Sequence, residues 1–180
     1  MYRITSMHGH SAMIFCNMTS KNGVGATEIG HDRESRTLVD GYEQPGSYKR
    51  KIKYDISMEQ IAAIINQSNN CEQFIKYECF NSGLLKNSYG WWVSRRGSKM
   101  NYWGGAAVDS GKCSCGMNNS CAGRKCNCDK NDQVWREDSG YLTDKNTLPV
   151  TELRFGDTTR TYKGIDELGY HTLGKLRCWG

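Results

Sequence analysis

Nine cysteines among 180 residues constrain this chain more than any other feature, and five of them fall between positions 113 and 128. Such a density indicates either disulfides formed in an oxidising compartment or a zinc cluster. Zinc sites favour Cys-x2-Cys pairs, whereas the pairs here are Cys113-x-Cys115 and Cys126-x-Cys128, with no histidine nearby. The spacing therefore favours disulfides, and no metal is expected.

The two cysteines of a Cys-x-Cys pair in a strand point to opposite faces, so each sulfur is expected to reach a different part of the chain. The bonds then close the 113–128 segment on itself or join it to cysteines elsewhere. Eight cysteines allow on the order of a hundred pairings, and no single one is selected. The residues expected in disulfides are Cys16, Cys71, Cys79, Cys113, Cys115, Cys121, Cys126, Cys128 and Cys178.

An odd count leaves one cysteine over, and Cys16 lies near the N-terminus, away from the cluster. Its partner is expected upstream of this segment or in another chain, as an intermolecular disulfide. A buried thiol is the alternative.

The interior of the molecule is expected to be thin, because only 37% of the residues are apolar and the mean hydropathy is −0.71. A disulfide typically contributes ~2–4 kcal/mol, which would offset a weak core. The length predicts one compact domain over residues 1–180, with an irregular cysteine-rich lobe at about 104–140. Aromatic residues, at 11%, argue against disorder.

Three N-x-[ST] sequons, at Asn17, Asn66 and Asn118, are consistent with a glycosylated, exported protein. No apolar signal segment follows Met1, so the chain is interpreted as an excised piece whose N-terminus is truncated. No apolar run is long enough to cross a membrane. Together with the cysteines, these features predict an extracellular location, either secreted or in the ectodomain of a membrane protein.

The charge and the motifs exclude several classes of function. The net charge of +5 is modest and mixed in sign along the chain, so no nucleic-acid groove is expected. No metalloprotease, P-loop, nucleophile-elbow or Rossmann motif occurs. We therefore expect no catalytic residues, no enzymatic activity and no cofactor.

Hydrophobic periodicity predicts an α+β fold. Strands are expected at residues 2–5, 12–16, 48–54, 71–80, 91–93, 148–155 and 176–178, the first two joined by a turn at Gly9. One helix is expected after Ser57, where Ser57-x-x-Gln60 forms a capping box and Met58, Ile61 and Ile65 share a face. Residues 104–130 show little periodicity.

A group of aromatic and basic residues is the candidate binding site. Aromatic rings beside cations can bind sugars, sulfated glycans or a protein hot spot. Burial of these rings in the sheet or under the cysteine lobe is the alternative interpretation. The candidate residues are Trp91, Trp92, Arg95, Arg96, Tyr102 and Trp103, with Lys99 nearby.

Weaker signals are a basic strand face and two possible metal ligand sets. Residues 49–53 carry Lys49, Arg50, Lys51 and Lys53, either a contact for an anionic partner or a solvated face. Asp129, Asn131 and Asp132 could begin a calcium loop, and a solvated turn is the alternative. His8 and His10 are interpreted as surface residues.

Several segments resemble the fibrinogen-like domain of the contactin-associated protein and neurexin-IV group. They include Cys16-Asn-Met-Thr19, Asn70-Cys-Glu-Gln-Phe-Ile-Lys-Tyr-Glu-Cys79, Gly90-Trp-Trp-Val93, Tyr102-Trp-Gly-Gly105, Trp135-Arg-Glu-Asp138, Leu148-Pro-Val-Thr151 and Leu176-Arg-Cys178. A weaker likeness, in Phe15-Cys-Asn-Met18 and Tyr77-Glu-Cys-Phe-Asn-Ser82, is to the C-propeptide of fibrillar collagens.

The first resemblance implies an extracellular, disulfide-bonded module with a fibrinogen C-terminal-like fold: a twisted, mostly antiparallel sheet with few helices. It also implies that Cys16 pairs with a cysteine just before the domain. A tryptophan-bearing strand of that family is missing, since Gly23-Val-Gly-Ala-Thr27 stands in its place.

Three functions are consistent with these features of the sequence. The first is a non-catalytic adhesion or recognition module that binds an extracellular protein or glycan. The second is a secreted structural component of the extracellular matrix, acting in matrix or biomineral assembly. The third is a calcium-dependent lectin.

Overall fold

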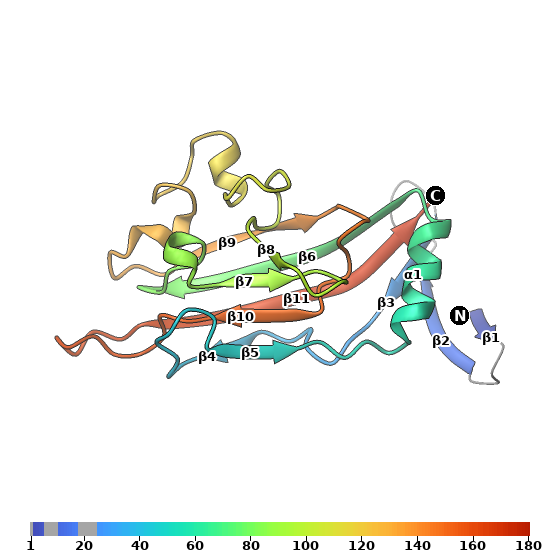
Figure 1. The fold of residues 1–180 in the computed structure, drawn as a ribbon, viewed down its shortest axis with the longest axis horizontal. Coiled ribbons are helices and arrows are strands. Elements are labelled where there is room, and N and C mark those ends of the chain that lie inside the picture. Colours follow the sequence, from blue (N-terminus) through green and yellow to red (C-terminus); the bar gives the residue numbers. More distant parts are fainter. Residues whose placement is uncertain (1, 6–10, 18–24) are drawn as a thin grey trace.

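The computed structural model describes residues 2–5, 11–17 and 25–180, and their strands form two sheets (Figure 1). The larger sheet has the order β1-β2-β3-β11-β6-β9, with β4 also pairing β11, and the smaller has the order β5-β10-β7-β8. Every described strand pairing is antiparallel. The fold is therefore a mostly antiparallel, disulfide-bonded α+β structure, as the sequence predicts at that level.

The strands have the following bounds. The large sheet contains β1 (Tyr2–Thr5), β2 (Ser11–Asn17), β3 (Ala26–Ile29), β4 (Thr37–Val39), β6 (Asn70–Phe80), β9 (Arg136–Leu142) and β11 (Leu168–Trp179). The small sheet contains β5 (Tyr48–Lys51), β7 (Trp91–Val93), β8 (Lys99–Met100) and β10 (Glu152–Phe155). Gly9, where the turn between the first two strands was expected, lies outside the described residues.

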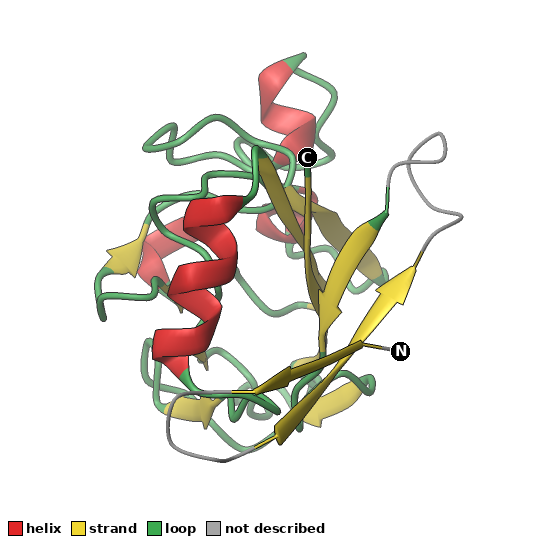
Figure 2. Ribbon diagram, turned by 90° about the vertical axis from the view of Figure 1, so that its right-hand side faces the viewer, coloured by secondary structure: helices red, strands yellow, loops and turns green. Residues whose placement is uncertain are grey.

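The single described α-helix is α1 (Met58–Gln67), and it confirms the predicted capping box. The Ser57 hydroxyl accepts the Gln60 N–H at 3.2 Å, and the Gln60 side chain accepts the Ser57 N–H at 3.0 Å. Ile61 and Ile65 are buried, as the helical spacing predicts. Figure 2 shows α1 on one side of the large sheet.

Within residues 2–5, 11–17 and 25–180, short 3-10 turns make up the remaining helical structure. They are η1 (Lys86–Ser88), η2 (Ser114–Met117) and η3 (Asn127–Lys130). In the part of the chain that is described, no helix is long and apolar enough to span a bilayer.

The two longest strands, β6 and β11, form the centre of the large sheet. Alternate residues of β6, from Cys71 to Cys79, are buried, so one face of this pair lines the core. The small sheet contributes Phe155, whose ring stacks on Tyr77 of β6 at a centroid distance of 4.4 Å. The core is thus shared between the two sheets as one hydrophobic cluster.

The opposite face of β6 and β11 carries a row of partly exposed rings. Phe80 contacts Trp135 at a centroid distance of 5.5 Å, and Trp135 contacts Tyr170 at 5.7 Å. The Arg36 guanidinium lies 3.5 Å from the centre of the Tyr170 ring and is paired with Glu78. These contacts cover part of this face of the large sheet.

The described cysteines form four disulfides, two between distant segments and two within one segment. Cys71–Cys178 joins β6 to β11, and Cys79–Cys128 joins β6 to η3. Cys113–Cys126 and Cys115–Cys121 close loops within the segment before β9. Of the alternatives left open by the sequence, both occur: the 113–128 segment is closed on itself and is also tied to the sheet.

The cysteine-rich lobe is shorter than expected. Its predicted range of 104–140 is wrong at the C-terminal end, because β9 begins at Arg136 and pairs with β6 over seven residues. We use the name cysteine-rich lobe for residues 104–135. Strand β11 is longer than the predicted 176–178; Gly169 within it packs so closely on Tyr77 that a Cβ would lie 2.2 Å from the Tyr77 hydroxyl oxygen.

Candidate functional site

The structure separates the aromatic residues that the sequence grouped together. Trp92 and Trp103 have no exposed side-chain area, and Tyr102 is 2% exposed. Trp92 Nε1 donates to the Tyr102 carbonyl at 2.8 Å, and Trp103 Nε1 donates to the Asp138 carbonyl at 2.9 Å. The expectation that these three rings form a binding surface is corrected: they are core residues, and both indole N–H groups are satisfied.

Trp91 points the other way from Trp92, because successive residues of β7 face opposite sides of the small sheet. It is only partly buried, and Lys99 of the neighbouring strand β8 holds its ammonium 3.8 Å from the centre of the Trp91 ring. Of the four predicted rings, Trp91 alone remains a candidate for contact with a ligand.

Arg95 is also a structural residue. Its Nη1 donates to the Lys145 carbonyl at 3.1 Å and to the Leu148 carbonyl, and so fastens the β7–β8 turn to the loop before β10. Arg96 is exposed at the tip of the same turn. Neither residue lines the cavity beside Trp91.

A cleft of about 570 Å³ lies between η1, β7 and β8 on one side and the cysteine-rich lobe on the other. We call it the Trp91 cleft. Its wall includes the apolar side chains of Leu85 and Met100 beside Trp91. Its further lining residues are Lys86, Asn87, Ser88, Gly90, Lys99, Asn101, Gly111, Arg124, Lys125 and Asp129.

Positive charge dominates the Trp91 cleft. Its lining includes four cations, Lys86, Lys99, Arg124 and Lys125, and none of them forms an ion pair with a described residue. The Trp91 ring holds Lys99 but carries no net charge that would neutralise it. The cleft is therefore arranged to attract an anion.

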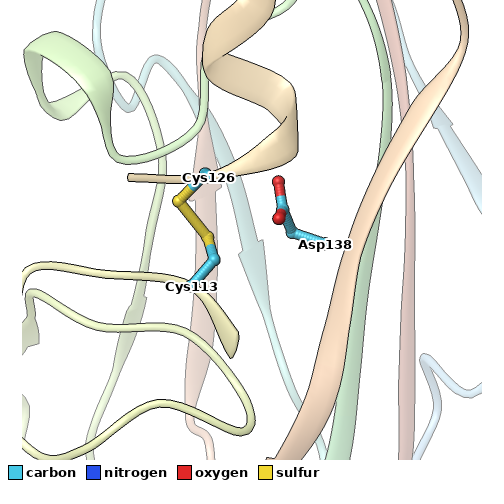
Figure 3. A group of neighbouring side chains, drawn as sticks. All are labelled: Cys113, Cys126 and Asp138. Atoms are coloured by element: carbon cyan, nitrogen blue, oxygen red, sulfur yellow. A yellow bond between two sulfur atoms is a disulfide. The ribbon is translucent and has the colours of Figure 1, made fainter. Parts of the chain in front are cut away.

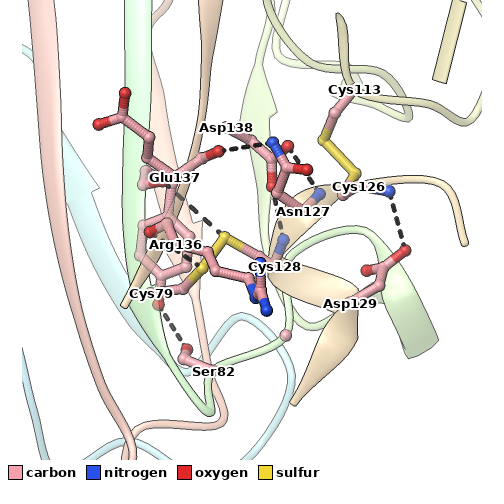
Figure 4. The surroundings of a disulfide bond; sticks show 12 residues. Cys79, Ser82, Cys113, Cys126, Asn127, Cys128, Asp129, Arg136, Glu137 and Asp138 are labelled. Carbon is pink, nitrogen blue, oxygen red and sulfur yellow. Dashed lines mark hydrogen bonds between the residues drawn. A yellow bond between two sulfur atoms is a disulfide. The ribbon is translucent and has the colours of Figure 1, made fainter. Parts of the chain in front are cut away.

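Asp129 is the one acidic residue among the described residues of that lining, and its carboxylate accepts backbone N–H groups of the cysteine-rich lobe. Its Oδ2 accepts the N–H group of Cys126 at 3.1 Å (Figure 4) and that of Lys125, also at 3.1 Å. These bonds fix the backbone that carries Lys125. Asp129 thus orients one wall of the cleft.

Asp138 of β9 anchors the cysteine-rich lobe to the large sheet. Its two carboxylate oxygens accept the N–H groups of Asn127 and Cys128, each at 2.9 Å (Figure 4). Burial raises the pKa of this carboxyl to about 6, against the lowering effect of the two backbone hydrogen bonds. Together with Cys79–Cys128, Asp138 holds η3 in place.

Among the described residues, two groups of side chains have the spacing of metal ligands. In the first, Cys113 and Cys126 are bonded to each other beside Asp138 (Figure 3). Because disulfide sulfurs are not thiolates and both Asp138 oxygens accept N–H groups, this group does not suit a metal. The predicted preference for disulfides over zinc agrees with this geometry.

The second group consists of the surface carboxylates of Glu43, Asp157 and Glu167, whose oxygens lie within 4.8 Å of one another. Desolvation first, and then the neighbouring carboxylates, raise the pKa of Glu167 to about 7. Desolvation is also the main cause that raises the pKa of Asp157 to about 6. The group is distant in sequence from the Trp91 cleft lining and shares no residue with it.

The possible calcium loop is not assembled as the sequence suggested. Asp132 forms a salt bridge with Arg136 at 2.6 Å, while Asp129 accepts backbone N–H groups of the lobe. These partners fit the alternative interpretation, an ordinary turn. His8 and His10 lie outside the described residues.

The three sequons lie in different settings. Asn66 is exposed on α1, and Asn118 is exposed just after η2. Asn17 is the last residue of β2, and its side chain lies outside the described part. Glycosylation at all three stays a prediction.

Sequence reasoning missed the lobe side of the cleft, above all Arg124 and Lys125. These residues lie between Cys121 and Cys126, and their place in space depends on Cys113–Cys126, a pairing that the sequence left open. The basic pair itself was a visible signal, but nothing in the sequence placed it opposite Trp91.

Comparison with curated proteins identifies relatives of this chain. It is 40% identical over 165 residues to neurexin-4 of Drosophila melanogaster and 34% identical over 175 residues to contactin-associated protein 1 of Mus musculus and of Homo sapiens. These alignments cover 86% and 93% of this chain but only 13% and 12% of the relatives. No family model matches the chain.

Proposed function

Because this chain is homologous over most of its length to one segment of neurexin-4 and of contactin-associated protein 1, we propose that it is a non-catalytic extracellular recognition module. The identity of 40% over 165 residues is the observation that carries the proposal. The name of contactin-associated protein 1 states an association with contactin, so a contactin-type ectodomain is the first protein partner to test.

The structure supports such a role through its rigid frame. Four disulfides fasten the lobe and the central strands, so a recognition surface on them would be held in one geometry before binding. Preorganisation of this kind lowers the entropic cost of association. The Trp91 cleft is the surface feature that combines a cavity, an aromatic ring and cations without ion-pair partners among the described residues.

We further propose that the fold is of the fibrinogen C-terminal type. The long central antiparallel pair, the single described α-helix and the irregular disulfide-bonded lobe support it. The expected pairing of Cys16 with a cysteine preceding the domain stays part of this proposal. An experimental structure that superposes on fibrinogen C-terminal domains with the same strand order would establish the fold.

The recognition proposal is tested with the oxidised chain, biotinylated at one terminus and displayed on streptavidin. Saturable binding is expected both to immobilised contactin ectodomain and to cells that display it, with loss of binding after reduction and alkylation. Absence of saturable binding to every extracellular ligand tried, or binding that survives complete reduction, would contradict the proposal.

A further inference from the structure

Resting on the proposed recognition role, we infer that the Trp91 cleft binds a sulfated oligosaccharide. The charge of the cleft favours an anion: Lys86, Lys99, Arg124 and Lys125 line one cavity, and the only described carboxylate in its lining already accepts two backbone N–H groups. With the Asp129 carboxylate included, the lining keeps a net positive charge, and a bound anion relieves the mutual repulsion of these cations. A sulfate group supplies that charge at any physiological pH.

The position of Lys99 also favours an anionic ligand. Its ammonium is held over the Trp91 ring, where a neutral π-system orients it without cancelling its charge. Arg154, which also approaches this ring, is different: it is paired with Glu152 at 3.4 Å and donates to the Gly46 carbonyl. The contrast identifies Lys99 as the cation on this wall that is available to a ligand.

The uncharged lining of the cleft suits a sugar. Asn87, Ser88 and Asn101 are exposed and supply amide and hydroxyl groups, which match the donors and acceptors of sugar hydroxyls. Leu85 and Met100 add apolar surface for the carbon face of a ring. The combined chemistry is that of a polar ring with acidic substituents.

An acidic peptide is less well matched to this cleft. Extended peptides commonly bind by adding a strand to an exposed sheet edge. The edge beside the cleft is β8, which is only two residues long. A saccharide does not need such an edge, and the volume of about 570 Å³ is in the range of small-ligand sites.

The test uses the intact, oxidised chain and a heparin-derived hexasaccharide, with the chemically desulfated hexasaccharide beside it, in isothermal titration calorimetry. The cleft variant is Lys99→Gln/Arg124→Gln/Lys125→Gln. The matched control is Arg160→Gln/Lys163→Gln/Lys175→Gln, which removes the same charge at exposed positions outside the lining of the cleft. Circular dichroism and a melting curve check that both variants are folded.

We expect the cleft variant to bind the sulfated hexasaccharide at least tenfold more weakly, and the control variant to stay within twofold of the unmodified chain. Binding of the desulfated sugar is expected to be undetectable. Equal loss in both variants would show diffuse attraction to net charge and would overturn the inference. Equal binding of an acidic peptide of the same charge would overturn it too, because the site would then not select a saccharide.

These results are separable from the recognition proposal. If the chain binds its protein or cell ligand but not the sulfated hexasaccharide, the inference about the cleft fails and the recognition role stands. If the hexasaccharide binds but neither contactin nor any cell is bound, the recognition proposal fails and the anion site stands.

Discussion

At the residue scale, Gln73 shows how a fully buried polar side chain is satisfied by partners distant in sequence. Gln73 has no exposed area, yet its amide nitrogen donates to the Tyr54 hydroxyl at 2.8 Å and to the Gly174 carbonyl at 3.0 Å. Its amide oxygen accepts the Val150 N–H at 2.9 Å. One side chain thus joins β6, β11 and the segment before β10.

Replacing Gln73 by leucine is expected to lower the free energy of unfolding by about 2–4 kcal/mol, because the Val150 N–H loses its acceptor while it stays buried. Urea unfolding followed by tryptophan fluorescence measures the change. The control is Gln67→Leu, the same replacement at an exposed position of α1, for which a change below about 0.5 kcal/mol is expected. Equal effects of the two variants would show that the Gln73 contacts contribute nothing.

The carboxylates of Glu43, Asp157 and Glu167 predict a dependence of stability on pH. The pKa of Glu167 is raised from 4.5 to about 7 in the fold, so the folded state binds more protons than the unfolded state between these values. Stability from this group is therefore lost as the pH rises through that window. The penalty comes first from desolvation of the charged Glu167 carboxylate and then from repulsion by its acidic neighbours; it is fully present above pH 7 and absent below pH 4.5.

Glu167→Gln is accordingly expected to raise the melting temperature at pH 8 and to leave it unchanged near pH 4, because glutamine carries no charge at either pH. Melting curves of both proteins across this range measure the difference. A difference that is the same at every pH, or a destabilisation at pH 8, would contradict the assignment of the raised pKa to this group.

At the element scale, local signals decided which segments could be predicted. Strand β6 and helix α1 were predicted because their apolar residues follow the periods of 2.0 and 3.6 over many positions. Strand β9 was not, because it begins with Arg136, Glu137 and Asp138, of which Asp138 is buried. The fold tolerates the burial of Asp138 because its carboxylate accepts the N–H groups of Asn127 and Cys128. The alternation of apolar and polar residues along the sequence does not show these contacts.

The capping box of α1 is a prediction at this scale. Ser57→Ala is expected to lower the free energy of unfolding by about 1 kcal/mol, since the Gln60 N–H loses its acceptor. Gln60→Ala removes the reciprocal bond to the Ser57 N–H. In a double-mutant cycle measured by urea unfolding, the two losses should be less than additive, and full additivity would show that the two bonds act independently.

At the scale of the whole molecule, disulfides join chain segments that the sequence patterns do not show to be neighbours. The sequence indicated that the cysteines form disulfides, and eight of them are joined in four disulfides in the structure. The lobe, whose sequence shows little periodicity, has short 3-10 turns and no strand over residues 104–135. The pairing itself could not be predicted, because it depends on which strands are neighbours. Trp91 was predicted from the sequence as a candidate binding residue. Arg124 and Lys125, on the far side of the cleft, were not, because their position there depends on the disulfide pairing.

Loop length should rank the contributions of the disulfides. Removing Cys71–Cys178, which spans 107 residues, is expected to cost about 4–5 kcal/mol, and removing Cys115–Cys121, which spans 6, about 2 kcal/mol. Paired Cys→Ser variants measured by urea unfolding test this order. A larger loss for the short loop would mean that denatured-chain entropy does not govern stability here.

The central claim is that cross-links between cysteines hold the sheets and the lobe in one arrangement. The most direct test is mass spectrometry of peptides from the native chain, digested without reductant after alkylation of free thiols. Linked peptides are expected for Cys71–Cys178, Cys79–Cys128, Cys113–Cys126 and Cys115–Cys121. Alkylation of these eight cysteines in the folded protein, or a metal ion bound among them, would contradict the claim.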